Sequence, residues 1–427
     1  MTPPQPPGCG GADLKALIHD HFGPETRPLG IAVSGGSDSM ALLHLMQGWG
    51  AAPLRCVTVD HRLRAEAASE AAQVAATCAE LGVPHDTLVW EDWNGQGNLP
   101  AAARAARYRL MADWAAQHGL AGIVLGHTAD DVAETLLMRL ARRAGVDGLA
   151  AMQARRALHG TVLHRPLLKA RRADLRAYLA AHGAAWIDDP SNDDPRYRRT
   201  AARRALATLA PVGVDAAALA EVAAHLGEAR ATLQHYAAQE AARIASVHQG
   251  DLLLEAAGFA ALRPDMARRI LAAGLLWVSG SEPGAGPAAR GPDITRLMDA
   301  IAAGRGGTLA GCRITQGGGR KSAHLRLARE HAALSGVTAL LGAPWDGRWR
   351  LKGPAVPGAH VAALGPDGRA QCPDWRASGL PAHSIDASPA LWQGGHLISA
   401  PLGGYAAGYS AEPCRDLRDL TACLLSH

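Results

Sequence analysis

Short apolar runs alternate with amphipathic stretches through the first third of the chain. The runs are rich in aliphatic and β-branched side chains, and they predict buried strands over residues 29–33, 54–59, 85–90 and 122–125. Apolar residues recur at helical spacing between them, which predicts helices over residues 13–22, 66–81 and 98–118, and from about residues 38 and 128 onward. Alternating strands and helices are typical of an α/β fold, so we expect a doubly wound parallel sheet with helices on both faces.

The pattern changes at about residue 205, where alanine-rich helical stretches begin. We expect helices over residues 265–278 and 293–303, and a longer one over 215–247 that is divided into two pieces around Gly227. Residues 308–315 predict a strand. Beyond residue 335 the pattern indicates short strands, with a hairpin turn at Asp346-Gly347 and one or two strands within 389–401.

The length of the chain, 427 residues, exceeds that of one ordinary domain. We therefore expect three domains: residues 1–205 with the parallel sheet, a helical connecting domain over 206–325, and a small β-rich α+β domain over 326–427. An apolar content of 48% is enough for packed cores. The net charge of +4 permits nucleic-acid binding without requiring it.

The cysteines argue against a disulfide framework, a zinc knuckle and an iron–sulfur site, because there are seven of them and no Cys-x-x-Cys pair. Residues 1–11 are rich in proline and glycine and lack the apolar core of a signal peptide. No apolar run is long enough to span a membrane. These features lead us to expect a cytoplasmic protein without membrane contact.

A glycine- and serine-rich loop connects the first predicted strand to the helix that follows. Its sequence is Ser34-Gly35-Gly36-Ser37-Asp38-Ser39. Glycines let backbone N–H groups approach an anion, and a helix N-terminus directs its free N–H groups and positive dipole end toward it. The serine hydroxyls add donors, and Asp38 can hold Mg²⁺. The loop lacks the lysine of a Walker A motif and the dinucleotide-binding glycine spacing; the alternative is a glycine turn without a ligand.

Other polar groups follow the second and fourth predicted strands. Asp60 and His61 come after one, and the segment 126–135 with His127, Asp130, Asp131 and Glu134 comes after the other. The carboxyl ends of strands in an open α/β sheet form the ligand crevice, so we expect these groups to converge with the glycine loop. The carboxylates could bind magnesium, accept a substrate ammonium or act as a general base. The alternatives are that Asp60 caps the next helix and that the acids stabilise a helix dipole.

Arginines are concentrated after the predicted nucleotide loop. Arg104 and Arg107 lie three residues apart on one helix face, where they would hold phosphates or a carboxylate, or form a solvated stripe. A strongly basic span over 139–204 indicates a polyanionic substrate. The alternative is a proteome that uses arginine in place of lysine.

The glycine loop resembles the pyrophosphate loop (PP-loop) of the ATP pyrophosphatase superfamily. An ordered set of further motifs resembles the tRNA(Ile)-lysidine synthase family within it. These motifs are Asp60-His-Arg-Leu-Arg64, Asn98 through Arg104 to Arg107-Tyr108, Gly126-His-Thr-Ala-Asp-Asp-Val-Ala-Glu-Thr135, Gly145-Val-Asp-Gly-Leu149, Arg165-Pro-Leu-Leu168 and Trp186-Ile-Asp-Asp-Pro-Ser-Asn192. Two departures are visible: Arg142-Arg143 stands where the family has Arg-Gly, and Thr200 where it has Asn.

The resemblance implies an N-type ATP pyrophosphatase fold, of the adenine nucleotide alpha hydrolase-like kind, and a two-step ligation. ATP and Mg²⁺ would activate the C2 oxygen of the wobble cytidine in the CAU anticodon of tRNA(Ile). Free L-lysine would then displace AMP, giving lysidine and changing the tRNA from methionine to isoleucine. The helical domain would contact the tRNA. The runner-up is a tRNA thiolase; small-molecule ligases of the superfamily and a noncatalytic nucleotide sensor are further alternatives.

The resemblance also distributes the site residues. ATP would contact Ser34, Gly35, Gly36, Ser37, Asp38, Ser39, Asp60 and His61, with Mg²⁺ on Asp38. Lysine binding and catalysis would involve Asp130, Asp131, Glu134, His127, Arg104 and Arg107. The tRNA would contact Arg142, Arg143, Arg171, Arg172, Arg199 and Arg203. The sequence leaves the oligomeric state and the identity of the base open.

Overall fold

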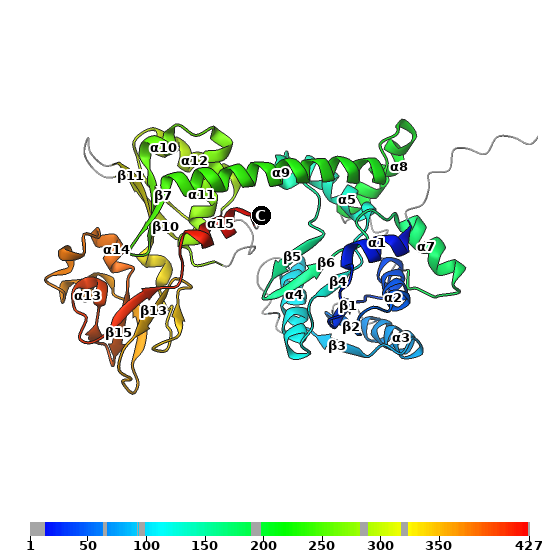
Figure 1. The fold of residues 1–427 in the computed structure, drawn as a ribbon, viewed down its shortest axis with the longest axis horizontal. Coiled ribbons are helices and arrows are strands. Elements are labelled where there is room, and N and C mark those ends of the chain that lie inside the picture. Colours follow the sequence, from blue (N-terminus) through cyan, green and yellow to red (C-terminus); the bar gives the residue numbers. More distant parts are fainter. Residues whose placement is uncertain are drawn as a thin grey trace, which may run out of the picture. The chain divides into compact units, whose positions relative to one another are not determined.

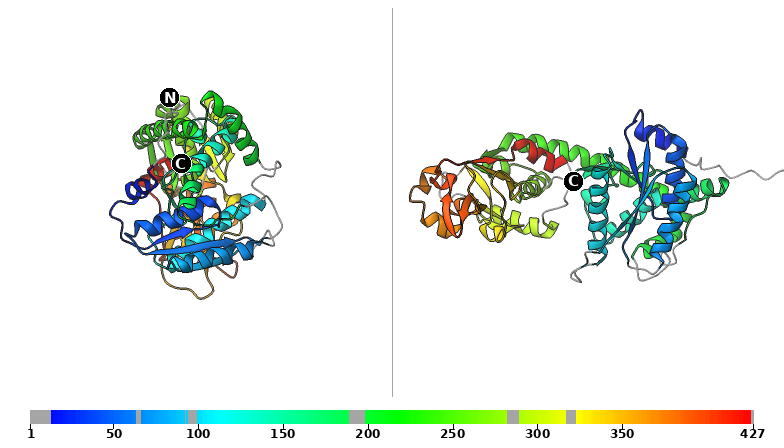
Figure 2. Two further views of the ribbon diagram at one scale, coloured as in Figure 1. Left: turned by 90° about the vertical axis from the view of Figure 1, so that its right-hand side faces the viewer. Right: turned by 90° about the horizontal axis from the view of Figure 1, so that it is seen from below.

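The computed structural model describes residues 13–62, 66–91, 93, 99–188, 198–281, 289–316 and 323–425 (Figures 1 and 2). It divides into two compact units, Met1–Arg230 and Ala231–His427, which we call the N-terminal and C-terminal units. The boundaries expected from the sequence at 205/206 and 325/326 fall inside the helix α8 (Arg198–Leu209) and the strand β11 (His324–Arg329). The division into three domains stays a prediction.

A six-stranded sheet with the order β3-β2-β1-β4-β6-β5 forms the centre of the N-terminal unit. Its strands are β1 (Leu29–Ala32), β2 (Leu54–Asp60), β3 (His85–Val89), β4 (Ile123–Leu125), β5 (Arg155–Leu158) and β6 (Thr161–His164). The first four strands and β6 pair in parallel, which confirms the doubly wound α/β fold. The sheet has one antiparallel edge strand, since β5 pairs antiparallel with β6 through a turn at His159-Gly160.

Helices cover both faces of this sheet (Figure 1). They are α1 (Leu14–Phe22), α2 (Ser37–Trp49), α3 (Ala67–Glu80), α4 (Leu99–Gln117), α5 (Ala129–Leu140), α6 (Val146–Leu149), α7 (Arg172–Ala181) and α8 (Arg198–Leu209), followed by the short 3₁₀ helix η2 (Ala210–Val212). One core lies on the side of α1, α2, α3 and α7 and includes Ile18, Leu42 and Leu175. The other lies on the side of α4 and includes Met111 and Trp114. Each face of the central strands is therefore buried.

One long helix, α9 (Ala216–Ile244), follows η2. The break expected at Gly227 is wrong, since the helix runs through this residue without interruption. A glycine inside a helix costs about 1 kcal/mol relative to alanine, which the remaining length of an alanine-rich helix tolerates. No single helix within the described ranges has the length and apolar composition needed to cross a membrane, although the bent pair of 198–212 with Ala216–Ile244 meets that test jointly.

The C-terminal unit contains a five-stranded antiparallel sheet with the order β7-β8-β11-β10-β9. Its strands are β7 (Ala245–His248), β8 (Asp251–Glu255), β9 (Gly307–Leu309), β10 (Cys312–Gln316) and β11 (His324–Arg329), and its helices are α10 (Ala256–Ala260), α11 (Pro264–Val278), α12 (Gly291–Ala302) and α15 (Leu417–Leu425). The single strand expected over 308–315 is wrong. It is two strands, β9 and β10, joined by a turn in which Ala310 and Gly311 have positive φ.

Two smaller antiparallel sheets complete this unit, with the orders β12-β13-β17 and β14-β15-β16. The strands are β12 (Pro344–Trp345), β13 (Trp349–Lys352), β14 (His360–Ala363), β15 (Pro389–Gln393), β16 (His396–Ser399) and β17 (Ser410–Pro413). Short helices lie between them: η3 (His331–Leu334), α13 (Gly365–Ala370), η4 (Trp375–Ser378), α14 (Ala382–Asp386) and η5 (Pro401–Gly403). The hairpin expected at Asp346-Gly347 is confirmed, because both residues have positive φ and β12 pairs with β13 across them.

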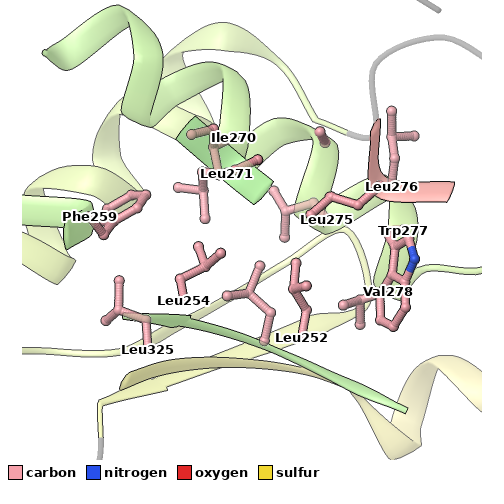
Figure 3. Close-up of a cluster of buried hydrophobic side chains, with 14 of the residues drawn as sticks. Leu252, Leu254, Phe259, Ile270, Leu271, Leu275, Leu276, Trp277, Val278 and Leu325 are labelled. Carbon is pink, nitrogen blue, oxygen red and sulfur yellow. The ribbon is translucent and has the colours of Figure 1, made fainter. Parts of the chain in front are cut away.

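The largest apolar cluster of the C-terminal unit lies between α11 and the five-stranded sheet (Figure 3). Ile270, Leu271 and Leu275 of the helix face Leu252 and Leu254 of β8. At the end of α11, Trp277 is only 1% exposed. Its indole N–H donates to the carbonyl oxygen of residue 416 at 2.8 Å, so this side chain is both packed and hydrogen-bonded.

We expect Trp277→Ala to lower the free energy of unfolding by about 3–5 kcal/mol, because it leaves a cavity and an unpaired carbonyl. Urea unfolding followed by far-UV circular dichroism measures the effect. Leu340→Ala is the control, since Leu340 is 75% exposed in the same unit and its truncation leaves no cavity. Equal unfolding midpoints for both variants would contradict the packing described here.

Candidate active site

The loop between β1 and α2 is held in shape by its own serines. The Ser39 hydroxyl accepts from the backbone N–H of Ser34 at 3.1 Å and donates to the carbonyl oxygen of Gly36 at 2.9 Å. Gly35 has a φ of +85°, and Gly36 is the N-cap of α2. The helix begins at Ser37, one residue before the expected start. The free N–H groups of its first turn and the positive dipole end therefore lie at the loop.

Two close contacts explain why glycines occupy this region. A Cβ on Gly126, which follows β4, would lie 2.9 Å from the backbone oxygen of Asp38. A Cβ on Gly35 would lie 2.6 Å from the Ile187 side chain, and the N–H of Ile187 donates to the Gly35 oxygen at 2.9 Å. The loop is therefore positioned by backbone contacts with the neighbouring strand end and with the segment after α7.

The helix α5 brings acidic residues to the same edge of the sheet. It begins with a capping box, in which Thr128 and Asp131 exchange hydrogen bonds at 3.0 and 3.4 Å. This exchange engages Oδ2 of Asp131. One turn later, Glu134 has a side chain that is 0% exposed. Buried carboxylates need partners, and arginines supply them here.

Arg172, at the start of α7, connects the glycine loop to these carboxylates. Its Nε lies 2.9 Å from Oδ2 of Asp38, its Nη2 lies 3.5 Å from Oδ1 of Asp131 and its Nη1 lies 3.4 Å from Oε1 of Glu134. Its backbone N–H donates to Asp130 at 2.7 Å. Burial raises the pKa of Asp38, and the Arg172 guanidinium opposes that rise. We call Arg172, Asp38, Asp131 and Glu134 the bridged carboxylate cluster.

Two arginines of α8 reach the same cluster. The Arg203 Nε lies 2.7 Å from Oε1 of Glu134, and the Arg199 Nε lies 3.6 Å from its Oε2. Arg172, Arg199 and Arg203 thus face carboxylates in this structure, although the sequence assigned them to tRNA. Arg171 pairs with Asp174 at 2.8 Å. The expected contacts of these four arginines with tRNA stay a prediction. The same holds for Arg142 and Arg143, which are exposed after α5.

A second group of basic side chains, Arg104, Arg107 and Arg165, surrounds Tyr108, and we call these arginines the basic group. The guanidinium carbons of Arg104 and Arg107 lie 5.1 and 5.2 Å from the ring centre of Tyr108. Burial lowers the pKa of His127 well below its usual value, with Arg165 and Arg107 contributing, so its imidazole is neutral at pH 7. Burial and Arg107 likewise lower the pKa of His61.

Asp60 is placed differently from the other predicted site residues. Its carboxylate accepts from the backbone N–H of Arg62 at 2.8 Å, and Arg62 has a φ of +52°. Asp60 therefore stabilises the turn after β2, while His61 faces the basic group. The motif residues 63, 64, 98 and 189–192 lie outside the described residues.

The sequence missed two arginines at this edge. Arg176, four residues after Arg172, places its Nε 3.3 Å from the Ser37 hydroxyl and pairs with Asp188 at 2.6 Å. Its spacing from Arg172 on one helix face was a usable signal. Arg165 directly follows β6, and only recognition of that strand could have placed it at the site.

The donor set at the loop suits Mg²⁺. This ion is usually held by one or two carboxylates together with substrate phosphates, and not by an all-protein cage. Asp38 stands at the start of the phosphate-loop helix with Asp131 linked to it through Arg172. Within the ranges that the structure describes, no group of three His, Cys, Asp or Glu side chains forms a metal cage. The position of Asp38 beside the phosphate loop fits this mode of binding.

We expect Gly126→Ala to displace the loop, because its Cβ would meet the Asp38 backbone and not a flexible side chain. Overpacking of this kind costs about 1–3 kcal/mol, so ATP affinity should fall about tenfold. Gly48→Ala in α2 is the control, since nothing lies within 4 Å of its Cβ. Calorimetric titration with ATP measures both; equal affinities would contradict the close contact.

Comparison with known proteins agrees with the geometry. Residues 12–210 match a PP-loop domain model. The tRNA(Ile)-lysidine synthase of Ruegeria pomeroyi is 47% identical over 422 residues, which cover 98% of this chain and 99% of that protein. The Brucella canis tRNA(Ile)-lysidine synthase is 38% identical over 87% of this chain and 85% of that protein. The Methylobacterium nodulans enzyme of the same name is 41% identical over 64% of this chain and 82% of that protein.

Among solved structures, the U34-tRNA thiolase NcsA of Methanococcus maripaludis with its [4Fe-4S] cluster is similar over 51% of this chain and 78% of that one. The identity is 14% and the TM-score 0.44, a likeness too weak to add to the fold seen directly. The relation to Ruegeria pomeroyi spans both units, from the phosphate loop to the C-terminal sheets. With its PP-loop, bridged carboxylates and end-to-end sequence match, the chain belongs to the tRNA(Ile)-lysidine synthase family.

Proposed function

We propose that this chain ligates free L-lysine to C2 of the wobble cytidine in the CAU anticodon of tRNA(Ile). ATP is converted to AMP and pyrophosphate, and the product is lysidine, which changes the specificity of the tRNA from methionine to isoleucine. The bridged carboxylate cluster carries the proposal, because it joins the phosphate loop to carboxylates suited to an amine substrate. The full-length match to the family supports it.

The first step requires charge stabilisation at the phosphate loop. The cytidine O2 attacks the α-phosphorus of ATP and the bond to pyrophosphate breaks. Loop N–H groups and the hydroxyls of Ser34, Ser37 and Ser39 hold the phosphates and stabilise the charge on the departing pyrophosphate. Asp38 would hold Mg²⁺, which would further neutralise that charge. His61, beside the end of β2, is proposed to contact the nucleotide.

The second step requires recognition and deprotonation of an amine. The lysine nitrogen attacks C2, AMP leaves, and the amine loses a proton to a carboxylate. Asp131 and Glu134 are the carboxylates that Arg172, Arg199 and Arg203 now neutralise. A substrate ammonium is a cation of the same charge, so it can take over part of these contacts. Asp130 holds the start of α7 through its bond to the Arg172 N–H, which makes it a positioning residue.

The remaining assignments concern the large substrate and the location. Exposed Arg142 and Arg143, together with Arg171 and the C-terminal unit, are proposed to contact the tRNA. His127 stays neutral and lies among arginines, where it is proposed to donate or accept a hydrogen bond near the substrates. We further propose that the protein works in the cytoplasm, where tRNA is modified.

We expect Asp131→Asn and Glu134→Gln to raise the KM for lysine at least tenfold, because each removes a negative charge that attracts the ammonium. ATP affinity should stay near that of the unaltered protein. Asp113→Asn removes an exposed carboxylate on α4 and is the control. Steady-state kinetics at varied lysine concentration measure the effect, and thermal melts check that each variant folds. A KM unchanged in both site variants would overturn the assignment.

The proposed function is tested by release of pyrophosphate from ATP in the presence of unmodified tRNA(Ile). The matched control is the same tRNA with uridine in place of the wobble cytidine. We expect release with the first RNA only. Uridine also has an O2, but its N3 carries a proton, whereas the unprotonated N3 and the N4 amino group of cytidine donate electron density to O2 and make it the stronger nucleophile. Release that proceeds equally without RNA would favour a small-molecule ligase, and ATP binding without any release would favour a nucleotide sensor.

A further inference from the structure

Three arginines at the carboxyl edge of the sheet form a cluster that the proposed mechanism leaves unused. Arg104 and Arg107 come from α4, and Arg165 follows β6. We call them, with Tyr108, the guanidinium cluster. The Arg104 Nη2 donates to the Tyr108 hydroxyl at 3.0 Å. The guanidinium carbons of Arg104 and Arg107 lie 5.1 and 5.2 Å from the centre of the Tyr108 ring. Arg165 is only 5% exposed and donates to the Gln153 oxygen at 2.8 Å.

The positive charge of this cluster is not balanced by nearby acids. In residues 13–62, 66–91, 93, 99–188, 198–281, 289–316 and 323–425, no ion pair joins Arg104, Arg107 or Arg165 to a carboxylate. Burial lowers the pKa of Arg165, with Arg156 and Arg104 adding to the effect, while Tyr108 opposes it. Burial raises the pKa of Tyr108, but the three surrounding arginines outweigh it and lower that pKa overall.

Among the residues that the structure describes, several buried nitrogen atoms of the cluster and its neighbours have no hydrogen-bond partner. They are the Nε atoms of Arg107 and Arg165, and the Nδ1 atoms of His61 and His127 are unpartnered beside them. An unsatisfied buried polar group costs about 1–3 kcal/mol, and more when it is charged. Four such atoms in one place are therefore a costly arrangement for the empty protein. An anion would accept from the Nε–H groups of Arg107 and Arg165, and from each imidazole in the tautomer that carries its proton on Nδ1, and would remove this cost.

The topology places these groups where ligands bind. His61, His127 and Arg165 directly follow or lie just beyond the carboxyl ends of β2, β4 and β6, and Ser34 lies beyond β1. Since β2, β1, β4 and β6 are parallel neighbours, these ends lie along one edge of the sheet. The guanidinium cluster thus occupies the β6 end of the same edge that carries the phosphate loop at β1.

We propose that Arg165, with Arg104 and Arg107, forms a second anion site that binds a phosphate group of the substrates, apart from the pyrophosphate held by the loop. A planar guanidinium can donate two parallel hydrogen bonds to two oxygens of one phosphate. The three positive charges of the cluster exceed the single negative charge of a carboxylate. This inference rests on the proposed function, which supplies two sources of phosphate: the nucleotide and the tRNA backbone. That phosphate would then lie along the same sheet edge as the carboxylates proposed for the lysine ammonium.

Binding measurements with Arg165→Gln and Arg107→Gln test the site. The first arm titrates ATP without RNA, and the second titrates a CAU anticodon stem-loop RNA without ATP. We expect at least a tenfold loss of affinity in one arm for both variants, because a charge-assisted hydrogen bond is lost. Arg165→Lys keeps the charge and should recover only part of the affinity. Arg109→Gln removes an exposed arginine from the same helix and is the control.

The two arms separate the sources of the phosphate. A loss confined to ATP assigns the site to the nucleotide. A loss confined to RNA, with a slope of log affinity against log salt shallower by about 0.7–0.9, assigns it to a tRNA phosphate. Unchanged affinity in both arms for both variants, or an equal loss in Arg109→Gln, overturns the proposal. Arg107 is less buried than Arg165, so its variant provides the test if Arg165→Gln unfolds.

Neither arm contains lysine or measures turnover. Failure of the proposed function would appear as the absence of lysine transfer by the unaltered protein, whereas failure of the second anion site would appear only in the affinities of the variants. The two failures are therefore distinguishable.

Discussion

The site depends on the bridge that one guanidinium makes between three carboxylates. Arg172 holds Asp38 of the phosphate loop together with Asp131 and Glu134 of α5, and its own backbone fixes Asp130. Removing one partner of a buried ion pair typically costs about 3–5 kcal/mol, because the remaining charge loses its compensation. The bridge therefore sets the geometry of the phosphate loop relative to the carboxylates, and it requires α7 to pack beside α2.

Charge is divided along the sheet edge in a way that suits the proposed substrates. Carboxylates gather near α5, while unpaired guanidiniums and neutral histidines gather near the ends of β2, β4 and β6. The proposed lysine ammonium would be attracted to the first region and the proposed phosphate groups to the second. In the strand order β1 lies next to β4, so the glycine loop adjoins the strand end that precedes α5, and β6 lies beyond β4. The proposed sites for the ammonium and for the phosphates thus share one edge of the sheet.

Local features of the site could be predicted from the sequence, because they depend on residues close together in the chain. The loop at 34–39 and the capping box of Thr128 and Asp131 are local in this sense. The strands β1, β2, β3 and β4 could be predicted from their apolar runs. Arg165 was noted only in the basic span and in the Arg165-Pro-Leu-Leu168 motif. Its place at the site was not predicted, because β5 and β6 are short, carry polar residues and form a hairpin that the alternating pattern does not signal.

Partners distant in the chain could not be predicted in this way. Arg172 meets Asp38 across 134 positions, so no spacing rule connects them. Arg199 and Arg203 were expected to face tRNA, and only the packing of α8 on α5 shows that they reach Glu134. The helix break predicted at Gly227 was wrong because a local property was given too much weight. The helix-breaking tendency of one glycine is small compared with the helical stability of the rest of α9.

The central claim is that the carboxylates serve an amine that ends on the tRNA. The most direct measurement is the transfer of labelled lysine to unmodified tRNA(Ile) with a CAU anticodon, counted against pyrophosphate formed from ATP. The account predicts one lysine bound to the wobble nucleotide for each pyrophosphate released. Pyrophosphate formation that depends on the tRNA but leaves it without lysine would contradict the account and indicate a different adenylation-driven modification.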